Sequence, residues 1–191
     1  MNKLAKWPVM FVTLTLGAHA NADDWHEGEN LLQPLPIPGE DWKLKRMTND
    51  KAKMEMARWS KSSGNGSETL QVIIAHDQHN GNVEILQEDE DEEGKGFCSS
   101  FSSDILDKGS ENTYKTITWK TKCKLRAENS EVVILHKAIS GEDSLYNIQK
   151  IWRDSFTEEN SRIWVDYVKR IKLCNTRGTQ HPCPEGFKRA Q

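Results

Sequence analysis

The most regular pattern of apolar and polar positions lies in the second half of the chain. Residues 114–123 alternate apolar and polar side chains, residues 132–139 are rich in β-branched side chains, and residues 144–153 alternate again. Alternation with a period of two indicates strands that are buried on one face. Because only short polar stretches separate the three segments, they predict an antiparallel meander of three strands.

A helical period follows this meander. After residue 158, apolar residues recur three and four positions apart, which is the spacing of a helix with one buried stripe. We expect a helix over residues 158–173 that starts at a capping box of Ser155 and Glu158, or at Thr157, and ends at Cys174. The predicted buried stripe consists of Ile163, Trp164, Tyr167, Val168 and Ile171.

The first half of the chain is less regular. Residues 42–47 and 52–59 alternate weakly and predict two strands on either side of a turn. Residues 70–75 form a short continuous apolar run, which indicates a central strand covered on both faces.

Residues 83–106 combine helical spacing of apolar side chains with six consecutive acids at residues 88–93, followed by Gly94 and Gly96. We expect a helix that is broken or frayed at the glycines, with its acids on a solvated side and Cys98 on a second helical piece. The acids lack the ligand spacing and the central glycine of an EF-hand. A solvated charged face is therefore a better interpretation than a calcium site.

Together, these elements predict one α+β domain over residues 41–191, with an antiparallel sheet of about five or six strands and helices packed on it. A chain of 191 residues fits one domain, because domains usually have roughly 100–200 residues. Residues 23–40 precede the domain as a proline-rich arm. In this arm Pro34, Pro36 and Pro38 favour an extended segment that lies against the core.

Residues 1–22 have the parts of a signal peptide. Lys3 and Lys6 precede an apolar stretch at residues 7–17, and the small residues before and at Ala22 offer a cleavage site. Such a stretch is too short to span a membrane, which takes roughly 20 apolar residues. We therefore expect a periplasmic or secreted protein that has no membrane span after cleavage.

Removing this leader changes the formal charge from −3 to −5, because the leader carries two lysines and no acid. An acidic chain argues against a nucleic-acid partner, which binds to basic surfaces. The expected partner is an envelope protein or a small polar ligand, and the sequence leaves the oligomeric state open.

The four cysteines form an even set in a compartment that permits oxidation. Of three possible connectivities we predict Cys98–Cys123 and Cys174–Cys183, because each pair flanks a local unit. A zinc site is the alternative, but no Cys-x-x-Cys spacing occurs.

Residues 141–153, with Cys-Asn-Thr-Arg at residues 174–177 and His-Pro-Cys at residues 181–183, resemble a group of exported bacterial proteins. Members share a proline-rich start, a Gly-x-x-Trp-Lys strand opening (here Gly39 to Lys43) and paired cysteines. The C-terminal Cys-x-Thr-Arg…His-Pro-Cys motif is the most specific part. The resemblance covers most of the chain after the leader and implies a periplasmic location without an assigned activity. The order of elements also resembles the sheet-and-helix sandwich of the Mog1/PsbP type.

His76 and His79 are three positions apart and could share a metal ion, with Glu84 or an acid of residues 88–93 as third ligand. Two surface histidines in a polar turn are the favoured interpretation, because no helix fixes their spacing. We expect no cofactor.

Arg177 and His181 form the sharpest candidate binding site. Inside the loop closed by Cys174 and Cys183, a guanidinium and an imidazole can bind a carboxylate or a phosphate. The alternative is that Arg177 only holds the shape of the loop through nearby carbonyls or acids.

The sequence contains no recognisable catalytic motif. It has no Gly-x-Ser-x-Gly, no Ser-x-x-Lys and no glycine-rich phosphate loop, and paired cysteines leave no thiol as a nucleophile. We therefore predict a non-catalytic binding or interaction module rather than an enzyme. Two alternatives stay open: a metal-dependent or hydrolase-like envelope enzyme centred on His76 and His79, and an inhibitor or immunity-type protein.

Overall fold

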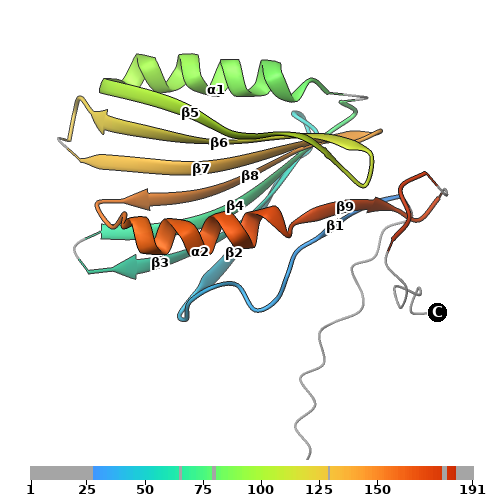
Figure 1. The fold of residues 1–191 in the computed structure, drawn as a ribbon, viewed down its shortest axis with the longest axis horizontal. Helices are drawn as coiled ribbons and strands as arrows, with labels where there is room; N and C mark the ends of the chain where they lie inside the picture. The colour runs from blue at the N-terminus through green and yellow to red at the C-terminus, as the bar shows by residue number, and fades with distance from the viewer. Residues whose placement is uncertain (1–27, 65, 79–80, 129, 178–179, 184–191) are drawn as a thin grey trace, which may run out of the picture.

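The computed structural model describes residues 28–64, 66–78, 81–128, 130–177 and 180–183. It contains a seven-stranded antiparallel sheet, a separate two-stranded sheet and two helices (Figure 1). The predicted leader lies outside the described residues. In chain order the elements are β1 (Glu29–Leu32), β2 (Lys43–Asn49), β3 (Met54–Ser63), β4 (Gly66–His76), α1 (Val83–Phe97), β5 (Cys98–Glu111), β6 (Tyr114–Leu125), β7 (Glu131–Ser140), β8 (Ser144–Arg153), α2 (Glu158–Lys169) and β9 (Lys172–Asn175).

The large sheet is built from two meanders that meet in its middle. Strands β2 to β4 form one meander and β5 to β8 the other, and β4 pairs with β8, which gives the order β2-β3-β4-β8-β7-β6-β5. The predicted three-stranded meander is confirmed as β6, β7 and β8. The antiparallel sheet with packed helices is also confirmed, but it has seven strands rather than five or six. With two helices among the described residues, the domain is mostly β and not a balanced α+β fold.

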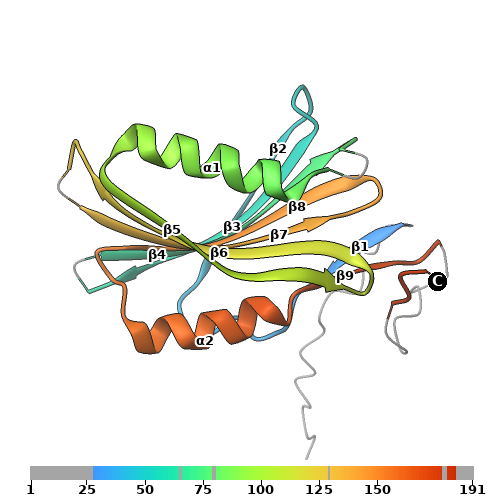
Figure 2. The same cartoon turned by 45° about the horizontal axis from the view of Figure 1, so that its top comes forward.

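The two helices lie on opposite faces of the large sheet (Figure 2). Beneath α2, Trp152, Trp164 and Tyr167 belong to the larger cluster of buried apolar residues. Beneath α1, the apolar cluster is small and includes Val83 and Trp119. Because successive residues of a strand point to opposite faces, the inner strands contribute to both clusters.

The segment that follows β4 differs from the prediction. Helix α1 runs unbroken through Gly94 and Gly96 to Phe97, and Cys98 begins β5, so the predicted second helical piece is wrong. The apolar residues beyond the helix pair with β6 instead. A Cβ at Gly94 would collide with the Phe101 ring, so the glycine lets the helix approach β5 closely.

The acids of α1 do not all face solvent, which corrects the predicted solvated side. Asp91 is only 7% exposed and Glu90 is half-buried, whereas the other four acids of the block are exposed. A helix turns once in 3.6 residues, so six consecutive side chains cannot share one side. Two of the acids therefore face the sheet.

Helix α2 begins at Thr157, one of the two predicted N-caps, whose hydroxyl accepts the Asn160 N–H. It ends at Lys169, so the predicted end at Cys174 is wrong. Leu173 and Cys174 belong to β9, because their backbone pairs with β1.

The predicted buried stripe is confirmed at four positions: Trp164, Tyr167 and Val168 in α2, and Ile171 just after its end. The prediction is wrong for Ile163, which is 52% exposed. At about 100° per residue, Ile163 points roughly a quarter turn away from the centre of the stripe.

Both predicted disulfides are confirmed. Cys98–Cys123 joins the start of β5 to β6, and Cys174–Cys183 closes the loop after β9, with Cα atoms 5.4 and 4.8 Å apart. Two disulfides fit the oxidising environment of a secreted or periplasmic protein. Within the described residues, neither helix is long and apolar enough to cross a membrane.

The proline-rich arm packs on the α2 side of the sheet. Leu31 and Ile37 contact the larger apolar cluster, and the Trp42 ring meets the Trp164 ring edge-on with centroids 5.8 Å apart. At its start, β1 pairs with β9 beside the β5–β6 turn. The arm therefore completes the larger core and brings two distant chain segments to one end of the sheet.

Candidate functional site

A pocket of about 380 Å³ opens at this end of the sheet. The start of α1, the β5–β6 turn, the β7–β8 turn and the loop after β9 meet there. Its volume falls in the range of small-molecule sites, roughly 300–1,000 Å³. The polar side chains that define its chemistry are those of Asn82, Glu84, Tyr114, Lys115, Glu142 and His181.

His181 is held in the pocket by contacts on both ring nitrogens. Nε2 lies 3.0 Å from a carboxylate oxygen of Glu142, and Nδ1 lies 2.9 Å from the backbone carbonyl oxygen of Asn112. Nδ1 also contacts the Thr113 hydroxyl, and the ring stacks on Tyr114 with centroids 3.9 Å apart. Both ring nitrogens therefore have partners within the protein, and together with the stacking they fix the orientation of the ring.

The β5–β6 turn presents these groups in a strained conformation. Asn112 and Thr113 have φ angles of 49° and 69°, which is the left-handed region of type I′ hairpin turns. Thr113 is β-branched, and positive φ is an outlier for such a residue. The Asn112 side chain holds the turn by donating to the Leu173 and Pro182 carbonyls at 3.0 and 3.3 Å. Backbone strain maintained by such contacts clusters at functional sites.

Strands β9 and β1 hold Glu142 in place, β9 through its carboxylate and β1 through its backbone N–H. One of its oxygens accepts the Asn175 side-chain amide of β9 at 2.7 Å. From β1, Glu29 accepts the backbone N–H groups of Glu142 and Asp143. A Cβ at Gly141 would collide with the Glu29 carboxylate, so only glycine fits there. Strands β1 and β9 thereby set the position of the turn that carries Glu142.

Two buried tyrosines lie next to these carboxylates. Burial and the charges of Glu29 and Glu142 raise the pKa of Tyr114, and burial and Glu29 raise the pKa of Tyr146. Both phenols therefore stay protonated and can donate. The Tyr146 hydroxyl donates to Glu29 at 3.4 Å, whereas the buried Tyr114 hydroxyl has no hydrogen-bond partner of normal geometry among the described residues.

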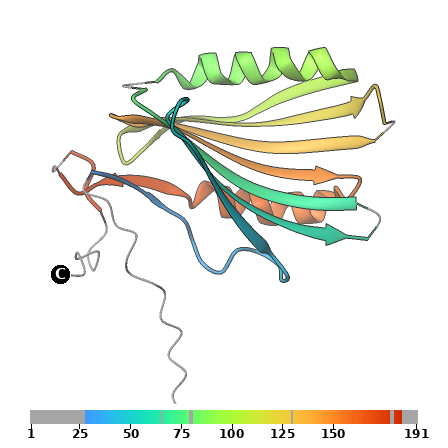
Figure 3. The same cartoon turned by 180° about the vertical axis from the view of Figure 1, so that it is seen from behind.

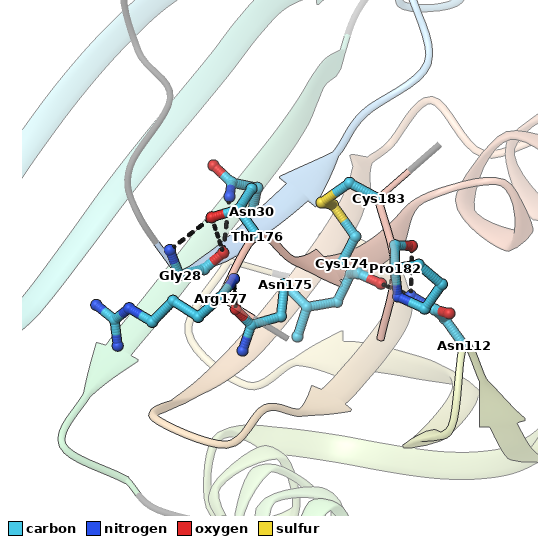
Figure 4. The surroundings of a disulfide bond; sticks show 10 residues. Gly28, Asn30, Asn112, Cys174, Asn175, Thr176, Arg177, Pro182 and Cys183 are labelled. Carbon is cyan, nitrogen blue, oxygen red and sulfur yellow. Dashed lines mark hydrogen bonds between the residues drawn. A yellow bond between two sulfur atoms is a disulfide. The ribbon is translucent and has the colours of Figure 1, made fainter. Parts of the chain in front are cut away.

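Arg177 lies beside the pocket rather than in its lining. Its guanidinium pairs with Asp143 at 3.3 Å and packs against Gly28. Figure 4 shows its side chain extending away from the Cys174–Cys183 disulfide. The structure thus brings Arg177 and His181 to consecutive acids of one turn, but of the two only His181 reaches the pocket.

The predicted histidine pair is only half described. His76 lies at the end of β4, with Nε2 3.1 Å from a Glu55 carboxylate oxygen and Nδ1 3.3 Å from the Ser144 hydroxyl. His79 lies outside the described residues, so the pair stays a prediction. The part of the chain that the structure describes holds no group of three or more His, Cys, Asp or Glu side chains placed to bind a metal.

Sequence reasoning misses several residues of the site, among them Tyr114, Glu142 and Glu29. The pattern places Tyr114 in a strand, Glu142 in a turn and Glu29 in an irregular arm, without linking them. One signal points to Glu142: it follows Gly141 at the start of the segment that resembles exported proteins. The contacts between Glu29 and the turn join residues more than a hundred positions apart, so local patterns do not reveal them.

Neither models of known protein families nor curated proteins match this chain. The fold and the pocket therefore define its class: a mostly antiparallel, disulfide-bonded domain with a polar pocket at one end of its sheet.

Proposed function

We propose that this protein is an exported, non-catalytic binding module that takes a small zwitterion in the pocket beside His181. The observation that carries the proposal is the lining of the pocket, where the Glu84 carboxylate and the Lys115 ammonium line one cavity and neither forms an ion pair with another described residue. A few polar groups that converge in a pocket of this size indicate a ligand-binding site.

The charges of the lining support a ligand that carries both signs. Glu142 and His181 already pair with each other at 3.0 Å. Of the remaining charged groups, Glu84 suits an ammonium group and Lys115 suits a carboxylate, so a neutral or singly charged ligand would leave one of the two without a counter-charge. Amino acids and short peptides are the simplest molecules with this pattern.

The carboxylate of such a ligand pairs with the ammonium of Lys115, an exposed residue of the pocket lining. The neighbouring His181 ring is already fixed by Glu142 and Asn112, so little ordering is needed on binding. The enzyme centred on His76 and His79 and the inhibitor or immunity-type protein stay open, but no contact among the described residues favours either.

Titration of the isotope-labelled protein with glycylglycine, followed by NMR, tests the proposal. We expect shifts in the amide signals of residues 113–115, 140–142 and 180–181, and weaker binding of acetate or methylammonium alone. Lys115→Gln removes the positive charge and keeps a polar side chain, and it should weaken glycylglycine binding about five- to tenfold.

Lys108→Gln is the matched control, because Lys108 is an exposed lysine of β5 that is not part of the pocket lining. It should leave the affinity unchanged. Equal binding by the wild type and Lys115→Gln, or no shift at all with glycylglycine, would contradict the proposal.

A further inference from the structure

One half of the sheet face that carries α1 is not covered by a helix. Helix α1 contacts β5, β6 and β7, which form one side of the sheet. On the same face, β2, β3 and β4 have no helix of the described residues above them (Figure 3). We call this surface the open half-face. It is defined by Lys45, Met47, Met54, Met56, Arg58 and Ile73.

One row of the open half-face is apolar. The pairing register places Met47, Met56 and Ile73 next to each other across β2, β3 and β4, and continues to Asn147 on β8. The Asn147 amide donates to Glu90 of α1 at 2.9 Å, so the whole row faces the side of α1. The three apolar side chains are half-buried, and methionine adapts its shape to different partners.

The next row is polar and continuous from α1 to the edge of the sheet. It runs from Gln149 on β8 through Gln71 and Arg58 to Lys45 on β2. Arg58 donates to Gln71, Gln71 donates to Gln149, and Gln149 donates to Glu90 at 3.0 Å. At one end, therefore, a carboxylate of a helix completes the row.

The other end of the row has no such carboxylate. Lys45 and Arg58 are exposed, and no acid of the described residues forms an ion pair with either. Two cations beside an apolar row form a surface that complements an acidic amphipathic segment.

We propose that the open half-face docks an amphipathic helix of a partner protein. Its apolar stripe packs on Met47, Met56 and Ile73, and its acidic flank lies over Lys45 and Arg58. The same face already holds a helix in this way, because α1 places Glu90 over the amides of Asn147 and Gln149.

The spacing of the sheet fits a second helix beside α1. Helix α1 lies over β5, β6 and β7, and Arg58 lies on β3, four strands or roughly 19 Å from β6 at about 4.8 Å per strand. Packed helices lie about 8–10 Å apart, so a helix next to α1 fits between α1 and Arg58, with its outer flank toward Arg58. The flank that faces α1 is neutral or basic, because the exposed acids of α1 repel like charge.

A synthetic helical peptide of about 16 residues, roughly 24 Å long, tests the docking. It carries leucines on one stripe, glutamates on one flank and lysines on the other, and its twin has glutamine in place of each glutamate. Affinity is measured by fluorescence anisotropy with the full mature protein and with the variant Lys45→Gln/Arg58→Gln. Arg162→Gln/Lys169→Gln on α2 is the matched control, because it removes the same two charge types from the opposite face.

We expect the wild type and the α2 control to bind the acidic peptide about tenfold more tightly than Lys45→Gln/Arg58→Gln does. The glutamine twin should bind weakly to all three proteins, and bound peptide should shift the amide signals of Met56 and Ile73. Equal affinity of the open half-face variant and the wild type overturns the proposal, and so does the absence of binding to the wild type. A dimer that Lys45→Gln/Arg58→Gln abolishes would also overturn it, because a second copy would then cover the surface.

Discussion

The two faces of the large sheet hold their buried polar groups in opposite ways. Beneath α2, Lys150 is completely buried, pairs with Glu68 at 2.6 Å and lies against three tryptophan rings. Lys137 is also buried, and its ammonium donates to the Val168 and Ile171 carbonyls at the end of α2. Each buried cation of this face therefore has several partners.

Beneath α1, polar groups are buried with fewer partners. Burial lowers the pKa of His136 to about 3, so the ring is neutral and stacks on Trp119 with centroids 4.3 Å apart. Among the described residues, five buried side-chain atoms on this face have no hydrogen-bond partner, against two on the other. They belong to Asp91, Ser103, Trp119, His136 and Asn147 beneath α1, and to Tyr114 and Trp152 on the α2 side.

This difference indicates which face of the sheet is packed more stably. A buried polar group without a partner costs about 1–3 kcal/mol, so the layer beneath α1 loses stability at several points. Binding regions tend to lie in such less stable parts of a fold. Helix α1 borders both the pocket, through Asn82 and Glu84, and the open half-face. The face with more unpaired buried polar atoms is thus the one that borders both proposed binding surfaces.

The largest effect is expected from Glu68→Gln, which leaves the Lys150 charge buried without its carboxylate. Breaking a buried ion pair in this way costs about 3–5 kcal/mol of unfolding free energy, measured by urea denaturation at pH 7. Burial lowers the pKa of Lys150 to about 8, below its unfolded value of about 10.4. Between these values the unfolded state binds more protons, so stability rises with pH. The cost of Glu68→Gln should therefore shrink at about pH 9.5, where Lys150 is neutral.

Glu68→Leu/Lys150→Met is the control for this variant. Replacing a whole buried ion pair by apolar side chains is often neutral, so the double variant should recover most of the lost stability. A cost below about 1 kcal/mol for Glu68→Gln would show that this ion pair does not anchor the α2 face.

An intermediate effect is expected in amide hydrogen exchange. Opening α1 hydrates the four side chains Asp91, Trp119, His136 and Asn147, which offsets part of the cost of opening. Opening α2 exposes large aromatic side chains and breaks the hydrogen bonds from Lys137 to the carbonyl groups at the end of α2. We therefore expect the amides of α1 to exchange about a hundredfold faster than those of α2, measured by NMR under native conditions.

The exchange data also contain their own control. The first four N–H groups of a helix have no partner within the helix, so only amides from the third turn onward are compared. Equal protection of the two helices would mean that the layer beneath α1 is fully satisfied, and the contrast between the faces would disappear.

The larger core and its strands follow closely from the sequence. Alternation over β6 to β8 and the spacing of Trp164, Tyr167 and Val168 reflect burial of one side, which is a local property of each element. The pairing of the cysteines follows from the local units that they flank. These features need no knowledge of distant contacts.

The α1 face and the pocket do not follow in the same way. The sequence predicts Asp91 at the surface, because only the packing of α1 on the sheet buries it. The sequence predicts a helix break at Gly94, but the lack of a side chain there makes room for Phe101 from the next strand. In the pocket, His181 can be singled out within its disulfide loop, whereas Glu29 and Glu142 meet only because β1 pairs with β9.

The smallest effect, and the sharpest test of the α1 layer, is expected from Glu90→Gln. Burial raises the pKa of Glu90, so its charged form is disfavoured in the folded protein. Asn147 and Gln149 donate to the same Glu90 oxygen, and glutamine keeps an oxygen that accepts both bonds. The variant should therefore be slightly more stable than the wild type at pH 7, measured by urea denaturation.

The pH dependence of stability shows whether the Glu90 charge causes the effect of Glu90→Gln. Because the folded-state pKa of Glu90 lies above its unfolded value, the wild type gains stability as pH falls through the folded-state pKa, and the advantage of Glu90→Gln should vanish by about pH 4. Glu88→Gln, an exposed acid on the same helix, should change nothing at either pH. If Glu90→Gln destabilised the protein at pH 7, the carboxylate would be a well-satisfied acceptor. The layer beneath α1 would then resemble the one beneath α2, and the proposal that α1 is less stably packed than α2 would be wrong.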